Sequence, residues 1–127
     1  MDTQRTIMVV DDNPDIITIV KTILEGKGYQ VLSASSGQEL LNLLTDRKPD
    51  LIILDIMMPE MDGLEVLGRL KAVTDTASIP VILLTAKVQY EDVLGGYKLG
   101  ADYYITKPFT STQLVNGINL LLGESKN

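Results

Sequence analysis

The sequence predicts an α/β protein built on a doubly wound parallel sheet of five strands and five helices. Five short apolar runs recur along the chain, at residues 6–10, 30–34, 51–54, 80–84 and 102–106. Each run is followed by a longer stretch that has the three- and four-residue apolar spacing of an amphipathic helix. The runs are largely continuous in apolar residues, as expected of strands that helices cover on both faces of a parallel sheet.

The first two helices have clear start signals. After the first run, Asn13 can cap a helix whose first position is Pro14, and Gly26 or Gly28 can end that helix. After the second run, SGQE at 36–39 has the form of a capping box and is followed by four leucines within five residues. We therefore expect a helix after each of the first two strands.

The three later helices differ in the strength of their signals. DGLE at 62–65 resembles a capping box and precedes leucines at helical spacing. Residues 88–99 have a helical pattern that Gly95 and Gly96 weaken. TSTQ at 110–113 can cap a final helix that is rich in leucine and isoleucine.

Size and composition limit the class of protein. A chain of 127 residues suits one domain, so we expect a single domain over residues 1–127 with its core at about 5–122. Eleven basic against 17 acidic residues give a formal net charge of -6, which argues against direct nucleic-acid binding. The N-terminus is no secretory signal and no apolar stretch is long enough to span a membrane, so we expect a cytoplasmic protein without membrane contact.

The absence of two residue types restricts the chemistry. The chain has no cysteine, which excludes disulfides, thiolate catalysis and zinc-thiolate sites. It has no histidine, which excludes a Ser-His-Asp triad and imidazole ligands. Any reaction must therefore use carboxylates, hydroxyls, lysines or backbone groups.

Polar residues follow four of the five predicted strands. Asp11 and Asp12 follow the first strand, Asp55 the third, Thr85 the fourth and Lys107 the fifth. In open parallel sheets ligands bind outside the carboxyl ends of the strands. We expect these five side chains to converge on one edge of the sheet.

Such a cluster suits phosphoryl transfer. Crowded carboxylates require a cation or a proton, and magnesium prefers oxygen ligands. Thr85 can donate to a phosphoryl oxygen, and Lys107 can supply a compact positive charge. Asp55 can be a metal ligand, a turn cap or a nucleophile that forms an acyl phosphate, and Asp12 can also cap the first helix. Together these groups offer what in-line transfer onto Asp55 requires.

Four motifs resemble a known family. VVDDNPD, LIILDIMMPEMDG, PVILLTA and GADYYITKPF, in this order and spacing, resemble the receiver domain of response regulators in two-component signalling. The resemblance covers essentially the whole chain, and four motifs in register make it specific. It implies a flavodoxin-like sheet of order 2-1-3-4-5 and magnesium-dependent transfer of a phosphoryl group from a partner phosphohistidine.

The resemblance assigns roles to the residues at the predicted edge. Asp55 matches the phosphoacceptor. Asp11 and Asp12 match the acidic pair that binds magnesium or manganese, with the backbone carbonyl of Met57 as a further ligand. Thr85 matches the switch hydroxyl.

Further positions match the family's conformational switch. Lys107 matches the site lysine, and in this family Pro108 commonly follows a cis peptide. Ala86 matches the small residue beside the switch hydroxyl, and Tyr104 matches the switch aromatic. In the family, phosphorylation changes the face made by the fourth helix, the fifth strand and the fifth helix. For Tyr104 and its neighbour Tyr103, a purely structural role is the alternative.

Two positions that vary within the family are candidates for tuning the lifetime of the phosphoryl group. They lie two residues after the acceptor and two after the switch hydroxyl, at Met57 and Lys87. An apolar Met57 can impede the attacking water. Lys87 can reach the phosphate or point to solvent.

The resemblance also implies partners. Because the chain has no histidine, a histidine kinase or histidine phosphotransfer protein must supply the phosphohistidine. Output is expected through a downstream protein target or a homodimer. The domain is expected to assist its own phosphoryl transfer and autodephosphorylation without being a conventional enzyme.

Two competing interpretations remain. A magnesium-dependent phosphatase with an aspartyl nucleophile would share this chemistry, but its usual second acid would fall on Met57. An interaction module that is never phosphorylated would typically lack an acid, the hydroxyl or the lysine, and all are present here. The sequence also leaves open whether this is a stand-alone protein or the receiver of a longer chain.

Overall fold

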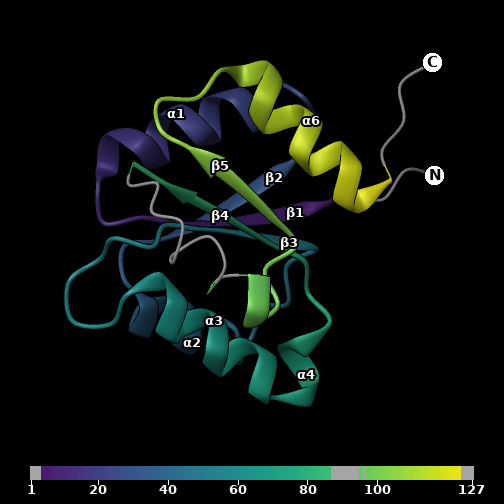
Figure 1. Cartoon of the computed structure of the whole chain (residues 1–127). Helices are drawn as coiled ribbons and strands as arrows, with labels where there is room; N and C mark the ends of the chain where they lie inside the picture. The colour runs from purple at the N-terminus through teal and green to yellow at the C-terminus, as the bar shows by residue number, and fades with distance from the viewer. Residues whose placement is uncertain (1–3, 87–94, 96, 124–127) are drawn as a thin grey trace.

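A computed structural model describes residues 4–86, 95 and 97–123, and for Thr85 only the backbone. Five parallel strands form one sheet in the order β2-β1-β3-β4-β5 (Figure 1). The strands are β1 (Thr6–Val10), β2 (Gln30–Ala34), β3 (Leu51–Leu54), β4 (Val81–Thr85) and β5 (Tyr103–Thr106). The predicted fold class and strand order are confirmed, and three strands have the predicted bounds.

The two remaining strands each begin one residue later than predicted. Pro80 has no N–H for the sheet, although its carbonyl accepts a hydrogen bond from the Ile52 amide at 3.0 Å. Asp102 accepts the Val81 N–H with its side-chain Oδ2 at 2.8 Å, so it is joined to β4 by its side chain as well as by its backbone. These two residues therefore lead into the sheet.

Helices cover both faces of the sheet. They are α1 (Pro14–Glu25), α2 (Gly37–Leu43), α3 (Gly63–Ala72), α4 (Thr74–Ala77) and α6 (Ser111–Leu122). Helices α1 and α6 lie on one face, and α2, α3 and α4 lie on the other (Figure 1). The short helix α4 was not predicted. Most of the helix predicted over 88–99 lies outside the described residues, of which Gly95, Tyr97 and Lys98 are helical.

The core has two layers because side chains alternate along each strand. In β1, Ile7 and Val9 belong to the apolar cluster under α1 and α6, whereas Met8 and Val10 belong to the cluster under α2 and α3. All four are at most 1% exposed. Each buried side chain of this kind contributes about 1.5–3 kcal/mol relative to an exposed one. The continuous apolar runs thus serve two cores at once.

Side-chain caps start the four longer helices, as predicted. The cap residues and the backbone amides that donate to them are Asn13 with Asp15, Ser36 with Glu39, Asp62 with Glu65 and Thr110 with Gln113. At Thr110 the capping box is complete, because the Gln113 side chain accepts the Thr110 N–H at 2.9 Å. Glu39 instead accepts the Ser35 N–H at 2.7 Å. Within the described residues, no helix has the length and apolar character needed to cross a membrane.

Candidate functional site

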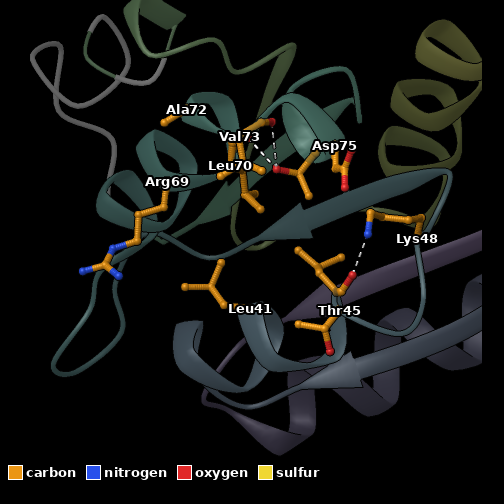
Figure 2. A pocket seen from close by; sticks show the side chains of 10 residues that line it. Leu41, Thr45, Lys48, Arg69, Leu70, Ala72, Val73 and Asp75 are labelled. Atoms are coloured by element: carbon orange, nitrogen blue, oxygen red, sulfur yellow. Dashed lines mark hydrogen bonds between the residues drawn. The ribbon is translucent and has the colours of Figure 1, made fainter.

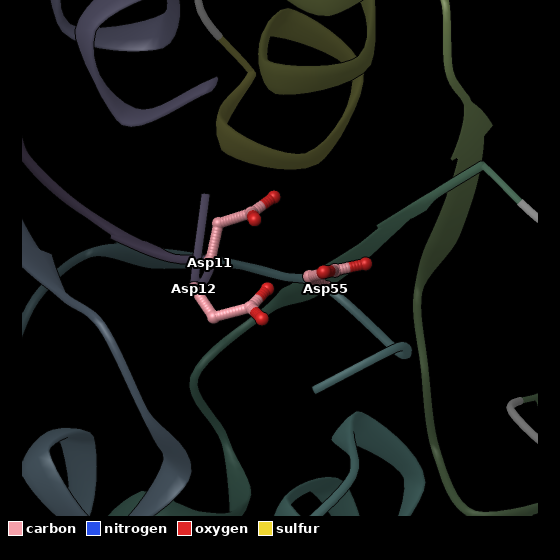
Figure 3. Close-up of side chains that lie close together, drawn as sticks. All are labelled: Asp11, Asp12 and Asp55. Atoms are coloured by element: carbon pink, nitrogen blue, oxygen red, sulfur yellow. The ribbon is translucent and has the colours of Figure 1, made fainter. Parts of the chain in front are cut away.

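Three aspartates meet at the carboxyl edge of the sheet. Strands β1 and β3 are paired so that Val10 lies beside Leu54, which brings the next residues, Asp11 and Asp55, close together. The Asp55 N–H extends the ladder by donating to the Val10 carbonyl at 3.0 Å. Carboxylate oxygens of Asp11, Asp12 and Asp55 lie within 4.8 Å of one another (Figure 3). The predicted convergence of these acids is therefore present.

The three carboxylates differ in their surroundings. Asp11 and Asp55 are 1% and 3% exposed, whereas Asp12 is exposed. The Asn13 N–H donates to Asp11 Oδ1 at 2.9 Å, and the Met57 N–H donates to Asp55 Oδ1 at 3.2 Å. The two buried acids thus each hold a backbone amide from two residues further along the chain.

Lys107 joins this cluster from the end of β5. Its Nζ lies 2.8 Å from Asp11 Oδ2 and 3.7 Å from Asp55 Oδ2, and its side chain is 16% exposed. The peptide bond from Lys107 to Pro108 is cis, as the resemblance implied. One ammonium group therefore faces two buried carboxylates.

Burial and negative neighbours change the acidity of Asp55. Its pKa is raised from 3.8 to about 6, chiefly by burial and further by the charges of Asp11 and Asp12. The Lys107 ammonium and the Met57 N–H lower it, but they offset only part of the increase. A nearby cation therefore stabilises the charged form of Asp55 more than it would stabilise that of an exposed aspartate.

The donor set fits a hard divalent cation. It offers three carboxylates, two of them buried, against one ammonium group. Oxygen ligands and excess negative charge are what Mg²⁺ prefers, and the exposed Asp12 leaves a side on which the ion can keep water. The acidic cluster is compatible with magnesium.

Two further predicted site residues are only partly described or not described. The backbone of Thr85 pairs with Thr106, at the same edge of the sheet as Lys107, and its side chain lies outside the described part. Lys87 lies outside the described residues. Ala86 is described and is exposed. The roles of Thr85 and Lys87 stay predictions.

The neighbouring tyrosines face opposite sides of the sheet, as strand alternation requires. Tyr104 is half-buried and packs against the cluster under α2 and α3. Tyr103 packs against the cluster under α1 and α6, close to Gly117. Tyr104 is not one of the clustered acids, and its role as the switch aromatic stays a prediction.

One position near the acids was not recognised from the sequence. Gly63 begins α3 and lies against the backbone of Asp55 and Ile56. Its signal was the Asp-Gly pair at 62–63, which indicates the start of a helix but not what that helix touches.

A separate hollow lies between α2 and the end of α3 (Figure 2). Its volume is about 560 Å³, and it is lined by Leu41, Leu44, Thr45, Lys48, Arg69, Leu70, Ala72, Val73, Asp75 and Thr76. These residues lead into β3 and β4, so the hollow is at the edge of the sheet opposite Asp55. None of its lining residues belongs to the acidic cluster.

The chain is similar to known proteins over nearly its whole length. The family model of the response regulator receiver domain matches residues 7–119. The phosphate regulon transcriptional regulatory protein PhoB of Pseudomonas aeruginosa is 42% identical over 118 residues, which are 93% of this chain and 52% of that protein. The alkaline phosphatase synthesis transcriptional regulatory protein PhoP of Bacillus subtilis is 40% identical over 96% of this chain and 50% of that protein. The chain spans about half the length of these relatives.

Solved structures share the fold. The chemotaxis protein CheY4 of Vibrio cholerae superposes with a TM-score of 0.89 at 28% identity, over 94% of this chain and 99% of that chain. A putative response regulator from Chloroflexus aurantiacus superposes with a TM-score of 0.91 at 30% identity, over 96% of this chain and 100% of that chain. The phosphorylated cyanobacterial phytochrome response regulator RcpA gives a TM-score of 0.86 at 28% identity, over 98% of each chain.

Proposed function

The chain belongs to the response regulator receiver domain family, and we propose that Asp55 is the residue on which it accepts a phosphoryl group. Receiver domains are signalling domains of two-component systems, and their general mechanism is phosphorylation of an aspartate. One observation carries the assignment to Asp55. It is a buried carboxylate at the carboxyl edge of the sheet, with two acids and an ammonium group around it.

The proposed reaction is a single displacement at phosphorus. A carboxylate oxygen of Asp55 attacks the phosphorus atom of a phosphohistidine, so an O–P bond forms and the P–N bond breaks. The electron pair of the broken bond stays on the imidazole nitrogen, which takes up a proton from solvent. Because these 127 residues contain no histidine, the phosphohistidine comes from outside them, and we assign it to a histidine kinase or a histidine phosphotransfer protein.

The acidic cluster would hold the divalent ion of the reaction. Receiver domains bind Mg²⁺ at an acidic pocket. We place the ligands here at Asp11, Asp12, Asp55 and the backbone carbonyl of Met57, with Mg²⁺ or Mn²⁺ as the ion. When bound, the ion supplies positive charge beside the transferred phosphoryl oxygens.

Lys107 and Thr85 would contact the phosphoryl group from the neighbouring strands. Asp11 holds the Lys107 ammonium at 2.8 Å, so the ammonium is already in place close to Asp55 before transfer. The Thr85 hydroxyl would donate to a phosphoryl oxygen. With Thr85 as the switch hydroxyl and Tyr104 as the switch aromatic, phosphorylation would change the surface near β5 and α6.

We infer that output passes through protein contact at that surface, with a downstream protein or with a second copy of the chain. The relatives include transcriptional regulators by name, but the net charge of -6 offers no general attraction for nucleic acid. A single folding unit over residues 5–122, a cytoplasmic location and assisted autodephosphorylation are further parts of this proposal.

Site mapping tests the assignment to Asp55 directly. The protein is treated with phosphoramidate and Mg²⁺, reduced with borohydride and digested for peptide mass spectrometry. Because borohydride converts an aspartyl phosphate to homoserine, the proposal expects homoserine at position 55. Homoserine at Asp11 or Asp12 would contradict it. Turnover of a general phosphate ester would instead favour the phosphatase interpretation.

A further inference from the structure

Gly63 lies so close to the phosphoacceptor backbone that no side chain fits there. A Cβ atom built on Gly63 would overlap the Asp55 carbonyl oxygen, and it would lie 2.7 Å from Ile56 Cα and 2.9 Å from the Asp55 carbonyl carbon. All three neighbours are backbone atoms, so no side-chain rotation can relieve the overlap. The first residue of α3 is therefore in direct contact with the peptide that follows Asp55.

Hydrogen bonds fix this contact from both directions. The Gly63 N–H donates to the Ile56 carbonyl at 2.9 Å, and the Met58 N–H donates to the same carbonyl at 3.1 Å. The Asp62 side chain caps α3 by accepting the Glu65 N–H at 2.9 Å. Both ends of the loop at 57–62 are thus bonded to one carbonyl, that of Ile56, which belongs to the peptide that carries the Met57 N–H.

We propose that Gly63 is a positioning residue that sets the Met57 backbone against the Asp55 carboxylate. Met57 lies between Ile56 and Met58, the two residues held by the bonds above, and its N–H reaches Asp55 Oδ1 at 3.2 Å. Its carbonyl is also the metal ligand assigned under the proposed function, on which this part of the inference rests. Any side chain at position 63 would push α3 away from Asp55 and move the Met57 peptide.

The first test replaces Gly63 by alanine. Reacting groups that are misplaced by about 1 Å can lose about a hundredfold in rate. We expect Gly63→Ala to weaken Mg²⁺ binding and to slow phosphorylation by acetyl phosphate at least tenfold, on the order of what such a shift can cost. We also expect faster amide hydrogen exchange at Met57 in the metal-free protein.

Two glycines provide matched controls for the same substitution. Gly68 lies in α3 as well, and a Cβ there would be 3.9 Å from its nearest neighbour, Leu99 Cδ2. Gly68→Ala should leave Mg²⁺ affinity and Met57 exchange unchanged. Gly117 in α6 would place a Cβ 3.0 Å from Tyr103 Cε2, so Gly117→Ala crowds the other face of the sheet. It should lower the melting temperature without changing Mg²⁺ affinity.

A second pair of variants serves if Gly63→Ala does not fold. Asp62→Ala removes both the charge and the cap of α3, whereas Asp62→Ser removes the same charge and keeps a capping oxygen. Both variants lack the Asp62 charge, so any difference between them reports the effect of the cap on the start of α3. We expect faster Met57 exchange and weaker Mg²⁺ binding in Asp62→Ala than in Asp62→Ser.

The deciding experiment combines calorimetric titration with MgCl₂ and amide exchange of the metal-free protein by NMR. The proposal is supported if Gly63→Ala loses Mg²⁺ affinity and shows faster Met57 exchange. Gly117→Ala, at a similar melting temperature, should show neither change. Wild-type affinity and exchange in Gly63→Ala would overturn it and leave only a packing role. If the wild-type chain accepts no phosphoryl group, the proposed function fails, while the exchange comparison still decides the role of Gly63.

Discussion

The Lys107 ammonium donates a 2.8 Å hydrogen bond to Asp11, a residue 96 positions earlier in the chain. The same nitrogen lies 3.7 Å from Asp55 Oδ2, beyond hydrogen-bonding distance. The lysine is thus anchored by one buried acid while it acts on the charge of the other. Burial keeps the pKa of Asp55 raised although this ammonium lowers it, and the ammonium lies beside the carboxylate that we assign as the phosphoacceptor.

Removing the ammonium group should change the acidity of Asp55. In Lys107→Met the Coulombic stabilisation of the Asp55 carboxylate is lost, so its pKa should rise above 6. The Asp11 carboxylate would lose its ion-pair partner, and we expect a fall of about 1–3 kcal/mol in the free energy of unfolding. Carbon-13 NMR titration of the carboxyl groups and urea denaturation measure the two effects.

Lys48→Met is the control for this substitution. Lys48 is exposed, and its Nζ donates to the Leu44 carbonyl at 2.8 Å. It precedes β3, whereas Asp55 follows that strand, so Lys48 lies at the edge of the sheet opposite the acids. It should leave the pKa of Asp55 unchanged. An unchanged Asp55 pKa in Lys107→Met as well would mean that the ammonium does not act on this carboxylate.

The buried charge of Asp55 should cost stability at neutral pH. Its folded pKa of about 6 exceeds the ordinary 3.8, so protonation favours the folded state. This contribution is fully present below pH 3.8 and is lost as the pH rises through 6. A neutral asparagine at this position avoids the loss, so Asp55→Asn should be more stable than wild type by about 2–3 kcal/mol above pH 7.

Urea denaturation of the metal-free proteins at pH 7.5 and pH 3.8 checks this prediction. The advantage of Asp55→Asn should be present at pH 7.5 and should largely disappear at pH 3.8. Equal stability of the two proteins at pH 7.5 would show that burial does not penalise this carboxylate.

The lifetime of the phosphoryl group should depend on Met57 and Lys87. The Met57 side chain is 52% exposed and adjoins the acceptor strand, so it can shield the site from water. We expect Met57→Asn to speed autodephosphorylation, because an amide can orient the attacking water, and Lys87→Ala to alter its rate. Decay of phosphoprotein after removal of the donor measures both, and unchanged decay in both variants would rule out this tuning.

The capping box of α6 should stabilise the edge of the fold that carries the proposed output. Thr110 accepts the Gln113 N–H at 3.0 Å and donates its own N–H to the Gln113 side chain. Thr110→Ala should lower the free energy of unfolding by about 0.5–2 kcal/mol. Thr112→Ala, one position inside the same helix, should have a much smaller effect in the same denaturation experiment. Equal losses would mean that the cap contributes nothing specific.

Much of the fold follows from local sequence pattern. The strands are apolar over nearly their whole length, and Asn13, Ser36, Asp62 and Thr110 all cap helices where the sequence predicted them. Helix α4 could not be predicted, because four residues are too few to show helical periodicity. The Glu39 side chain bonds to Ser35 rather than to the cap residue, a choice that the spacing alone does not determine.

The sequence predicts only those parts of the site that the order and direction of the strands are enough to bring together. Asp11, Asp55 and Lys107 each follow a strand, so a parallel sheet brings them to one edge whatever the details of packing. The unequal distances from Lys107 to the two acids depend on how β5 sits beside its neighbours. The contact between Gly63 and Asp55 depends on the path of a loop. Both are long-range properties that no local pattern carries.

The central claim is that Asp55 is phosphorylated and that the reaction requires a divalent ion. Intact-mass spectrometry after brief incubation with acetyl phosphate tests it most directly, with a metal-free sample and Asp55→Asn alongside. We predict a single phosphoryl adduct on the wild-type protein with Mg²⁺, and none on the variant or without metal. An adduct of equal yield on Asp55→Asn, or no adduct while a known receiver domain is modified under the same conditions, would contradict the account.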